Sequence, residues 1–251
     1  MNILVTRPNP AATELVVLLR KYGIKAWSFP LIYFVPGREL NLLPNKILSI
    51  KPRDMIFVLS KRAIIYADHY LKKTKTTWPS NVEYYSIGRA SAQILQQITG
   101  KCVKYPRNQE TSDALINIPS LQEIKNKRTL ILSGNGGRQL LANTLRDRGS
   151  NVSFCECYQR YNNVYSSIIE CNRWKNYGIN TIVVTSCEML KQLFSLFYIV
   201  DVNKWLLQCR ILVVSNRLAN LAYQLGWENI EICDNATNQA LLNKLIHLYN
   251  K

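Results

Sequence analysis

Metal-ligating residues are scarce in this chain. It has only two histidines, and none of its seven cysteines forms a Cys-x-x-Cys pair. A three-histidine metal site is therefore excluded, and the closest cysteines, Cys155 and Cys157, lack the spacing of zinc ligands. Because they stand two apart in a predicted strand, we expect both on one face. The simplest interpretation is that the cysteines are reduced and mostly packed, as in a reducing compartment.

Long apolar runs are also missing. No uncharged run approaches the roughly 20 residues that a membrane helix needs. The first residues, from Met1 to Arg7, lack the basic start and apolar stretch of a secretory signal. We therefore predict a cytoplasmic protein without a membrane partner. With 251 residues, 47% of them hydrophobic, the chain can bury a substantial core in one large domain or two smaller ones.

Acidic residues are few: 16 Asp and Glu stand against 32 Lys and Arg, a net charge of +16. Such a balance favours nucleic acid, an anionic membrane or a polyanionic small molecule as partner. Compositional drift toward Lys, Asn, Ile and Tyr is an alternative cause. The basic residues are scattered rather than gathered in a tail or one helix, so we predict no nucleic-acid partner.

The most informative feature is a unit that recurs along the chain. Six apolar runs end in small or hydroxyl residues and lead into segments with helical spacing, at residues 3–6, 56–60, 84–88, 130–134, 182–186 and 211–215. Continuous apolar runs of this length are typical of strands buried on both faces of parallel sheets. Several helical segments stop at a glycine, which fits the left-handed position that ends a helix. The glycines are Gly23, Gly100, Gly149 and Gly226. The pattern predicts a parallel α/β fold.

About ten such strands are many for one sheet, and two extended runs suggest a division. If the runs at 30–37 and 157–162 connect two sheets, the first domain is discontinuous, comprising residues 1–33 plus 163–251. The second domain is then the insertion at residues 38–156. A plain split near residue 125 is the competing interpretation.

Ligands of open α/β sheets bind outside the carboxyl ends of the strands. Helix N-termini there offer free N–H groups to anions, and arginine side chains match carboxylates. We therefore predict an anion-receiving cleft from residues at these ends: Arg7, Ser60, Arg62, Gly88, Ser133, Gly134, Arg138, Thr185 and Ser186. For any one of them, a helix cap or a solvated rim is the alternative.

The turn at residues 133–138 has the sequence Ser-Gly-Asn-Gly-Gly-Arg. It follows a strand and opens a helix, but it lacks both the P-loop ending and the full dinucleotide glycine spacing. Nucleotide binding is therefore weakly supported. A tight turn that presents Asn135 and backbone N–H groups to a carboxylate fits equally well.

Six motifs carry a resemblance to a known family, through their joint order along essentially the whole chain. They are residues 3–8, 29–32, 87–89, 132–138, 155–160 and 183–186. Together they resemble the bacterial uroporphyrinogen-III synthases. The resemblance implies two α/β domains joined by a two-stranded antiparallel linker, with the first domain built from both termini. It also implies conversion of hydroxymethylbilane, a linear tetrapyrrole with eight carboxylates, into cyclic uroporphyrinogen III.

That reaction loses water and inverts the last pyrrole ring. Because the sequence has no metal or nucleotide signature, we expect no cofactor and no metal. The resemblance implies that Tyr158, in the Cys-Tyr-Gln-Arg stretch, assists departure of the substrate's hydroxyl group. The alternative is that Tyr158 is a tyrosine of the linker strand that only packs between the domains. Relatives often carry Gly-x-x-Thr after two strands. At residues 88–91 this chain keeps a hydroxyl, so Ser91 is a predicted contact, whereas residues 215–218 lose both glycine and threonine.

The implied partner is hydroxymethylbilane, handed over transiently by hydroxymethylbilane synthase, and nothing in the sequence demands more than a monomer. Two alternatives from other classes stay open. One is a non-catalytic, two-lobed binding module for an anionic small molecule, and the other is a basic nucleic-acid-binding protein.

Overall fold

The computed structural model describes residues 1–136, 139–198 and 203–250. The chain divides into two compact units, Met1–Tyr33 with Tyr161–Lys251 (unit 1) and Phe34–Arg160 (unit 2). The strands are β1 (Asn2–Val5), β2 (Lys25–Ser28), β3 (Ile32–Pro36), β4 (Met55–Val58), β5 (Glu83–Ser86), β6 (Val103–Lys104), β7 (Arg128–Gly134), β8 (Asn151–Asn162), β9 (Thr181–Val183), β10 (Arg210–Val213) and β11 (Ile230–Ile232).

The α-helices are α1 (Ala11–Lys21), α2 (Leu43–Leu48), α3 (Lys61–Lys73), α4 (Arg89–Thr99), α5 (Ser112–Ile116), α6 (Gln139–Asp147), α7 (Ser167–Asn176), α8 (Cys187–Tyr198), α9 (Asn203–Gln208), α10 (Asn216–Gln224) and α11 (Asn238–Tyr249). Two short 3-10 helices, η1 (Leu40–Leu42) and η2 (Pro119–Leu121), lie in unit 2.

The sheet of unit 1 has the order β11-β10-β9-β1-β2, and its neighbouring strands pair in parallel. From β1 the chain moves outward to β2, and after unit 2 it resumes at β9, on the other side of β1. It then moves outward through β10 to β11. The direction of winding therefore reverses between β1 and β9, which is the switch point of this sheet.

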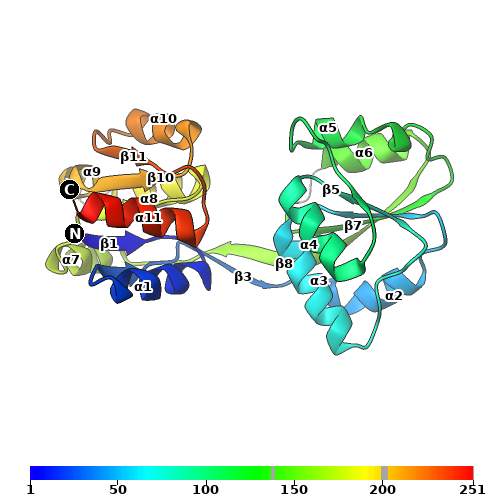
Figure 1. The fold of residues 1–251 in the computed structure, drawn as a ribbon, viewed down its shortest axis with the longest axis horizontal. Helices are drawn as coiled ribbons and strands as arrows, with labels where there is room; N and C mark the ends of the chain where they lie inside the picture. Colours follow the sequence, from blue (N-terminus) through cyan, green and yellow to red (C-terminus); the bar gives the residue numbers. More distant parts are fainter. Residues whose placement is uncertain (137–138, 199–202, 251) are drawn as a thin grey trace. The chain divides into compact units, whose positions relative to one another are not determined.

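Helices cover the sheet of unit 1 as the winding requires. Helices α1 and α11 lie side by side (Figure 1), and their leucines share a core with β1 and β9. Because parallel crossovers are right-handed, α8 and α10, which carry the chain the other way, cover the opposite face. Phe29, after β2, packs beside Trp174 of α7 at a ring separation of 5.3 Å.

The sheet of unit 2 has the order β3-β8-β7-β4-β5-β6, and the strands from β8 to β6 pair in parallel. Its switch point lies between β4 and β7. Alternate residues of β4 enter two different cores. Ile56 and Val58 pack with α3 and α4, whereas Met55 and Phe57 pack with α5 and α6. The strand is thus buried on both faces, as its continuous apolar run predicts.

The parallel α/β class and the two-domain organisation predicted from the sequence are confirmed. The glycines that end helices also behave as predicted: Gly23, Gly100, Gly149 and Gly226 all have positive φ. The extended run at 157–162 is not a separate element, because it continues the twelve-residue strand β8. Strand β3 is the sheet neighbour of β8, with the Gly37 N–H donating to the Cys157 carbonyl at 3.0 Å.

Among the described residues, no helix has both the length and the apolar character needed to cross a bilayer. Within the same residues, no three His, Cys, Asp or Glu side chains gather as a metal site would require. The two histidines, His69 and His247, are exposed on α3 and α11. All seven cysteines are free, and Cys155 and Cys157 are buried in the same core, on one face of β8 as predicted.

Candidate functional site

The switch point of unit 2 brings together three residues that are far apart in the sequence. Ser60 follows β4, Gly134 ends β7, and Tyr158 lies on β8, the next strand in the sheet. The Tyr158 hydroxyl lies 3.4 Å from the Ser60 hydroxyl. A Cβ atom on Gly134 would lie 2.4 Å from Cζ of the Tyr158 ring. The phenol therefore rests on the glycine backbone, where a side chain would displace it.

A β-bulge turns Tyr158 toward this position. Ser133 pairs with Glu156, but the next residue, Gly134, pairs with Tyr158, so that Cys157 is an extra residue on β8. Consecutive residues of a regular strand point to opposite faces. Here Cys157 and Tyr158 both pack against the core on the α3 and α4 side. Bulges of this kind re-aim side chains next to active sites.

Aromatic rings surround the phenol of Tyr158. The ring of Phe34, from β3, meets it edge-on at a centroid distance of 5.7 Å, and Tyr66 of α3 lies at 6.0 Å. The 3.4 Å separation from Ser60 exceeds that of a good O–H···O hydrogen bond. Both hydroxyls therefore keep the capacity to bond a third oxygen that approaches the two of them from one side.

Arg62 places a cation beside this ring cluster. Its guanidinium carbon lies 3.6 Å from the centroid of Phe34. Burial lowers the pKa of Arg62 below its usual value, and the nearby Tyr66 and Tyr158 oppose that shift. Arginine remains charged at any physiological pH. The site thus offers a phenol and a partly desolvated positive charge side by side.

The turn after β7 supports β8 through Asn135. The Asn135 N–H donates to the Tyr158 carbonyl at 3.1 Å, and its side chain bonds the backbone of Arg160. Ser133 is buried just before this turn. The predicted contact Arg138 lies outside the described residues.

The helix N-terminus at Gly88 already holds a carboxylate of the chain. The Arg89 N–H donates to Glu110 Oε1 at 2.8 Å. A Cβ on Gly88 would lie 2.4 Å from Glu110 Oε2. Ser91 is buried one turn into the same helix, α4. This N-terminus is therefore occupied by the carboxylate of Glu110. Gly88 and Ser91 as ligand contacts stay predictions.

Three predicted residues flank the switch point of unit 1. Arg7 follows β1, while Thr185 and Ser186 follow β9, the neighbouring strand. Arg7 donates to the Asn238 side chain of α11 at 2.5 Å. Burial lowers the pKa of Arg7, and Glu14 opposes that shift. The Ser186 hydroxyl accepts from the Met189 N–H at 3.2 Å, which is the bond of a helix cap.

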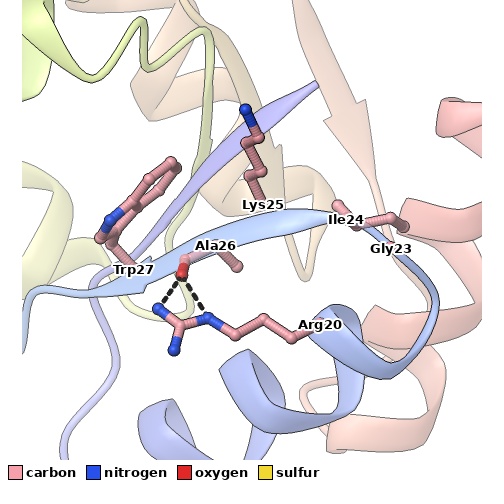
Figure 2. A pocket seen from close by; sticks show the side chains of 6 residues that line it. All are labelled: Arg20, Gly23, Ile24, Lys25, Ala26 and Trp27. Atoms are coloured by element: carbon pink, nitrogen blue, oxygen red, sulfur yellow. Dashed lines mark hydrogen bonds between the residues drawn. The ribbon is translucent and has the colours of Figure 1, made fainter.

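Two of the surface hollows lie along outer strands. One, of about 290 Å³, follows β2, where Arg20 of α1 reaches back to the strand (Figure 2). The Nη2 and Nε atoms of Arg20 donate to the Ala26 carbonyl at 2.8 and 3.2 Å. Arg20 thereby satisfies part of an exposed sheet edge, a structural role. The other hollow, of about 690 Å³, borders β6.

Sequence reasoning missed three residues that contact the predicted ones: Phe34, Tyr66 and Glu110. Tyr66 could have been inferred from the sequence, because Arg62 and Tyr66 are four residues apart in one helix and therefore share a face. Phe34 comes from β3, whose pairing with β8 no local pattern reveals. Glu110 lies in a loop without regular spacing.

Comparisons with known proteins agree with this picture. A family model described as "Uroporphyrinogen-III synthase HemD" matches residues 13–243. The chain is 49% identical to the uroporphyrinogen-III synthase of Salmonella typhimurium and 47% identical to that of Escherichia coli. Each alignment has 245 residues and covers 98% of this chain and all of the relative.

Solved structures share the fold. A mutant uroporphyrinogen III synthase of Thermus thermophilus superposes with a TM-score of 0.66 at 12% identity, over the full length of both chains. The enzyme of Helicobacter pylori gives a TM-score of 0.55 at 16% identity, covering 98% of this chain and 99% of that one. The sequence matches cover nearly the whole chain, and the chain belongs to the uroporphyrinogen-III synthase family.

Proposed function

We propose that the protein converts hydroxymethylbilane into uroporphyrinogen III, with loss of water and inversion of the last pyrrole ring. It is then a cyclising hydro-lyase of haem biosynthesis. The observation that carries the activity is the family match over residues 13–243. The observation that supports the site is the Tyr158 phenol, seated on Gly134 and 3.4 Å from the Ser60 hydroxyl.

In the first step Tyr158 assists departure of the hydroxyl. The carbon–oxygen bond of the hydroxymethyl group breaks as the attached pyrrole supplies its electron pair to the carbon. The phenol gives its proton to the leaving oxygen, which departs as water and leaves a phenolate. Phenols are weak acids, with an unperturbed pKa near 10. The electron-rich pyrrole supplies most of the driving force, so modest assistance suffices.

In the second step the protein controls which bond forms. The last pyrrole attacks the electron-poor carbon through the α-carbon that already carries the preceding methylene bridge. The bond to that bridge then breaks and re-forms at the ring's free α-carbon, which inverts the ring, and the proton lost from this carbon restores the phenol. Without enzyme the bilane is expected to close to the unflipped isomer. The main task is thus to hold a conformation in which inversion precedes closure, a matter of positioning.

Cations and backbone groups at both switch points suit a substrate with eight carboxylates. We propose contacts from Arg7, Thr185 and Ser186 in unit 1. In unit 2 we propose contacts from Ser60, Arg62, Gly88, Ser91, Ser133, Gly134 and Arg138. At Gly88 a substrate carboxylate would replace Glu110, whose carboxylate receives the Arg89 N–H. The charge of +16 favours capture of such a polyanion.

The wider setting is also part of the proposal. The pairing of β3 with β8 supports a two-stranded linker at residues 30–37 and 157–162, with domains at 1–33 plus 163–251 and 38–156. We also propose a monomer, since nothing in the sequence demands a second copy. Seven free cysteines suit the cytoplasm. Because uncatalysed closure competes, we also propose transient hand-off from hydroxymethylbilane synthase.

Product analysis tests the function. Purified protein is given freshly prepared hydroxymethylbilane, without added metal or cofactor, and the oxidised products are separated by isomer. We expect predominantly the type III isomer. Product identical to that of the protein-free control would contradict the proposal and would favour a non-catalytic binding module.

A further inference from the structure

The side chain of Asn135 is occupied by the backbone of β8. Its Oδ1 accepts from the Arg160 N–H at 2.7 Å, and its Nδ2 donates to the Arg160 carbonyl at 3.1 Å. The Asn135 N–H donates to the Tyr158 carbonyl at 3.1 Å. Asn135 therefore makes three hydrogen bonds to β8, on both sides of residue 159, and two of them come from the carboxamide.

These bonds lie where the backbone pairing between β7 and β8 ends. Strand β7 ends at Gly134, directly after the bulge, and β8 runs on to Asn162. A bulge leaves one residue unpaired and disrupts the ladder locally. The carboxamide of Asn135, with one acceptor and one donor in a plane, pairs with Arg160 as a neighbouring peptide would. It prolongs the β7–β8 pairing past the bulge.

We propose that Asn135 is a positioning residue for Tyr158, rather than the carboxylate contact that its sequence context predicts. Its bonds fix the backbone of β8 at Tyr158 and two residues further on, so the phenol stays over Gly134 and beside Ser60. Among the described residues of the turn, Asn135 alone follows β7 directly and bonds the backbone of β8 through both its main chain and its side chain. The inference rests on the role proposed above for Tyr158.

Two substitutions separate positioning from binding. Asn135→Ala removes both carboxamide bonds, while Asn135→Asp keeps the acceptor for the Arg160 N–H but turns an oxygen toward the Arg160 carbonyl. We expect each to lower kcat by about 10-fold, since small misplacements of a reacting group slow chemistry steeply, and to leave KM within about twofold. Asn143→Ala, an exposed asparagine of α6 that bonds only Arg146 among the contacts described, is the matched control and should change neither constant.

A double-mutant cycle provides the decisive kinetic readout. If Asn135 acts through the phenol, Asn135→Ala should cause no further loss of kcat once Tyr158 is phenylalanine. A rise in KM, or losses that multiply in the double variant, would overturn the inference in favour of a substrate contact. Circular dichroism and thermal melting of each variant confirm that it is folded before its rate is interpreted.

Nuclear magnetic resonance of ring-labelled tyrosine gives a readout that does not depend on activity. The Tyr158 signal is assigned as the one missing from Tyr158→Phe. We expect Asn135→Ala to shift it and Asn143→Ala to leave it in place; an unmoved signal in Asn135→Ala would overturn the inference. If Tyr158→Phe keeps full activity while the signal still moves, the positioning is supported and the proposed catalytic role has failed.

Discussion

Units 1 and 2 are built on the same plan but present different chemistry. Each has a parallel core of five strands whose winding reverses between two central strands. At that reversal unit 1 offers a guanidinium and two hydroxyls, from Arg7, Thr185 and Ser186. Unit 2 offers the Tyr158 phenol among aromatic rings, with Arg62 beside it.

Two local features account for the difference. The bulge in β8 re-aims Tyr158, and the extra strand β3, outside the parallel core, supplies Phe34. The strand order that the two units share therefore sets where a ligand can bind. The features found only in unit 2, the bulge and the extra strand, decide which side chains line that place. We expect unit 2 to govern the rate through Tyr158, and unit 1 to contribute to affinity alone.

The largest effect is expected from Gly134→Ala in unit 2. The added methyl would lie 2.4 Å from Tyr158 Cζ, so the phenol must move. Because a displacement of about 1 Å can cost about 100-fold in rate, we expect kcat to fall by roughly that factor. Steady-state kinetics with melting curves provides the measurement. An unchanged kcat in a folded variant would show that the phenol does not need its glycine seat.

Arg7→Ala in unit 1 should change affinity instead. Loss of one charge-assisted contact to a carboxylate is worth about 1.5–3 kcal/mol, so KM should rise by about 10- to 100-fold with kcat nearly unchanged. Arg7→Lys, which keeps the charge but loses the planar fork, should have an intermediate KM. A fall in kcat with an unaltered KM would erase the contrast between the units.

Phe34 gives a smaller effect that isolates its contact with Arg62. Phe34→Leu removes the ring under the guanidinium, and Phe34→Tyr keeps it. A cation–π contact is worth about 0.5–2 kcal/mol, so we expect roughly a 2- to 30-fold rise in KM for Phe34→Leu and near wild-type behaviour for Phe34→Tyr. Equal defects in both variants would assign Phe34 to packing alone.

The smallest effect concerns stability at the amino ends of the unit 2 strands. Burial pushes the pKa of Glu83 upward, but hydrogen bonds from Tyr85, Lys104 and Lys127 outweigh it and hold the pKa at about 2. A depressed carboxylate pKa stabilises the fold above about pH 4.5, and the stability is lost as the pH falls toward about 2. We expect Glu83→Gln to lower the free energy of unfolding by about 1 kcal/mol near neutral pH, after allowance for solvent screening.

Urea unfolding at several pH values checks this. The difference between wild type and Glu83→Gln should shrink as the pH falls below about 4.5. A difference that stays constant down to acidic pH would mean that the carboxylate charge contributes nothing.

The fold was largely predictable because its signals are local. Continuous apolar runs predict strands buried on both faces, and Ile56 and Phe57, adjacent in β4, indeed enter different cores. A glycine before several of the strands marks the left-handed end of a helix. Both signals need only short segments of sequence.

The site was less predictable because its geometry is not local. The strand-end pattern selected Ser60, Arg62 and Gly134, which the structure brings to the same switch point as Tyr158. A bulge register depends on two strands at once, so the sequence could not show that Asn135 bonds β8. For the same reason no spacing pointed to Phe34 or to Glu110 at the α4 N-terminus.

The most direct test of the account is the rate of Tyr158→Phe, measured together with its product isomers. The substitution removes the hydroxyl and keeps the ring, so stability should change little. We predict a rate about 100-fold lower, the usual range for a positioned proton donor, with the type III preference preserved in the residual product. An unchanged rate would contradict the account and leave Tyr158 a packing residue.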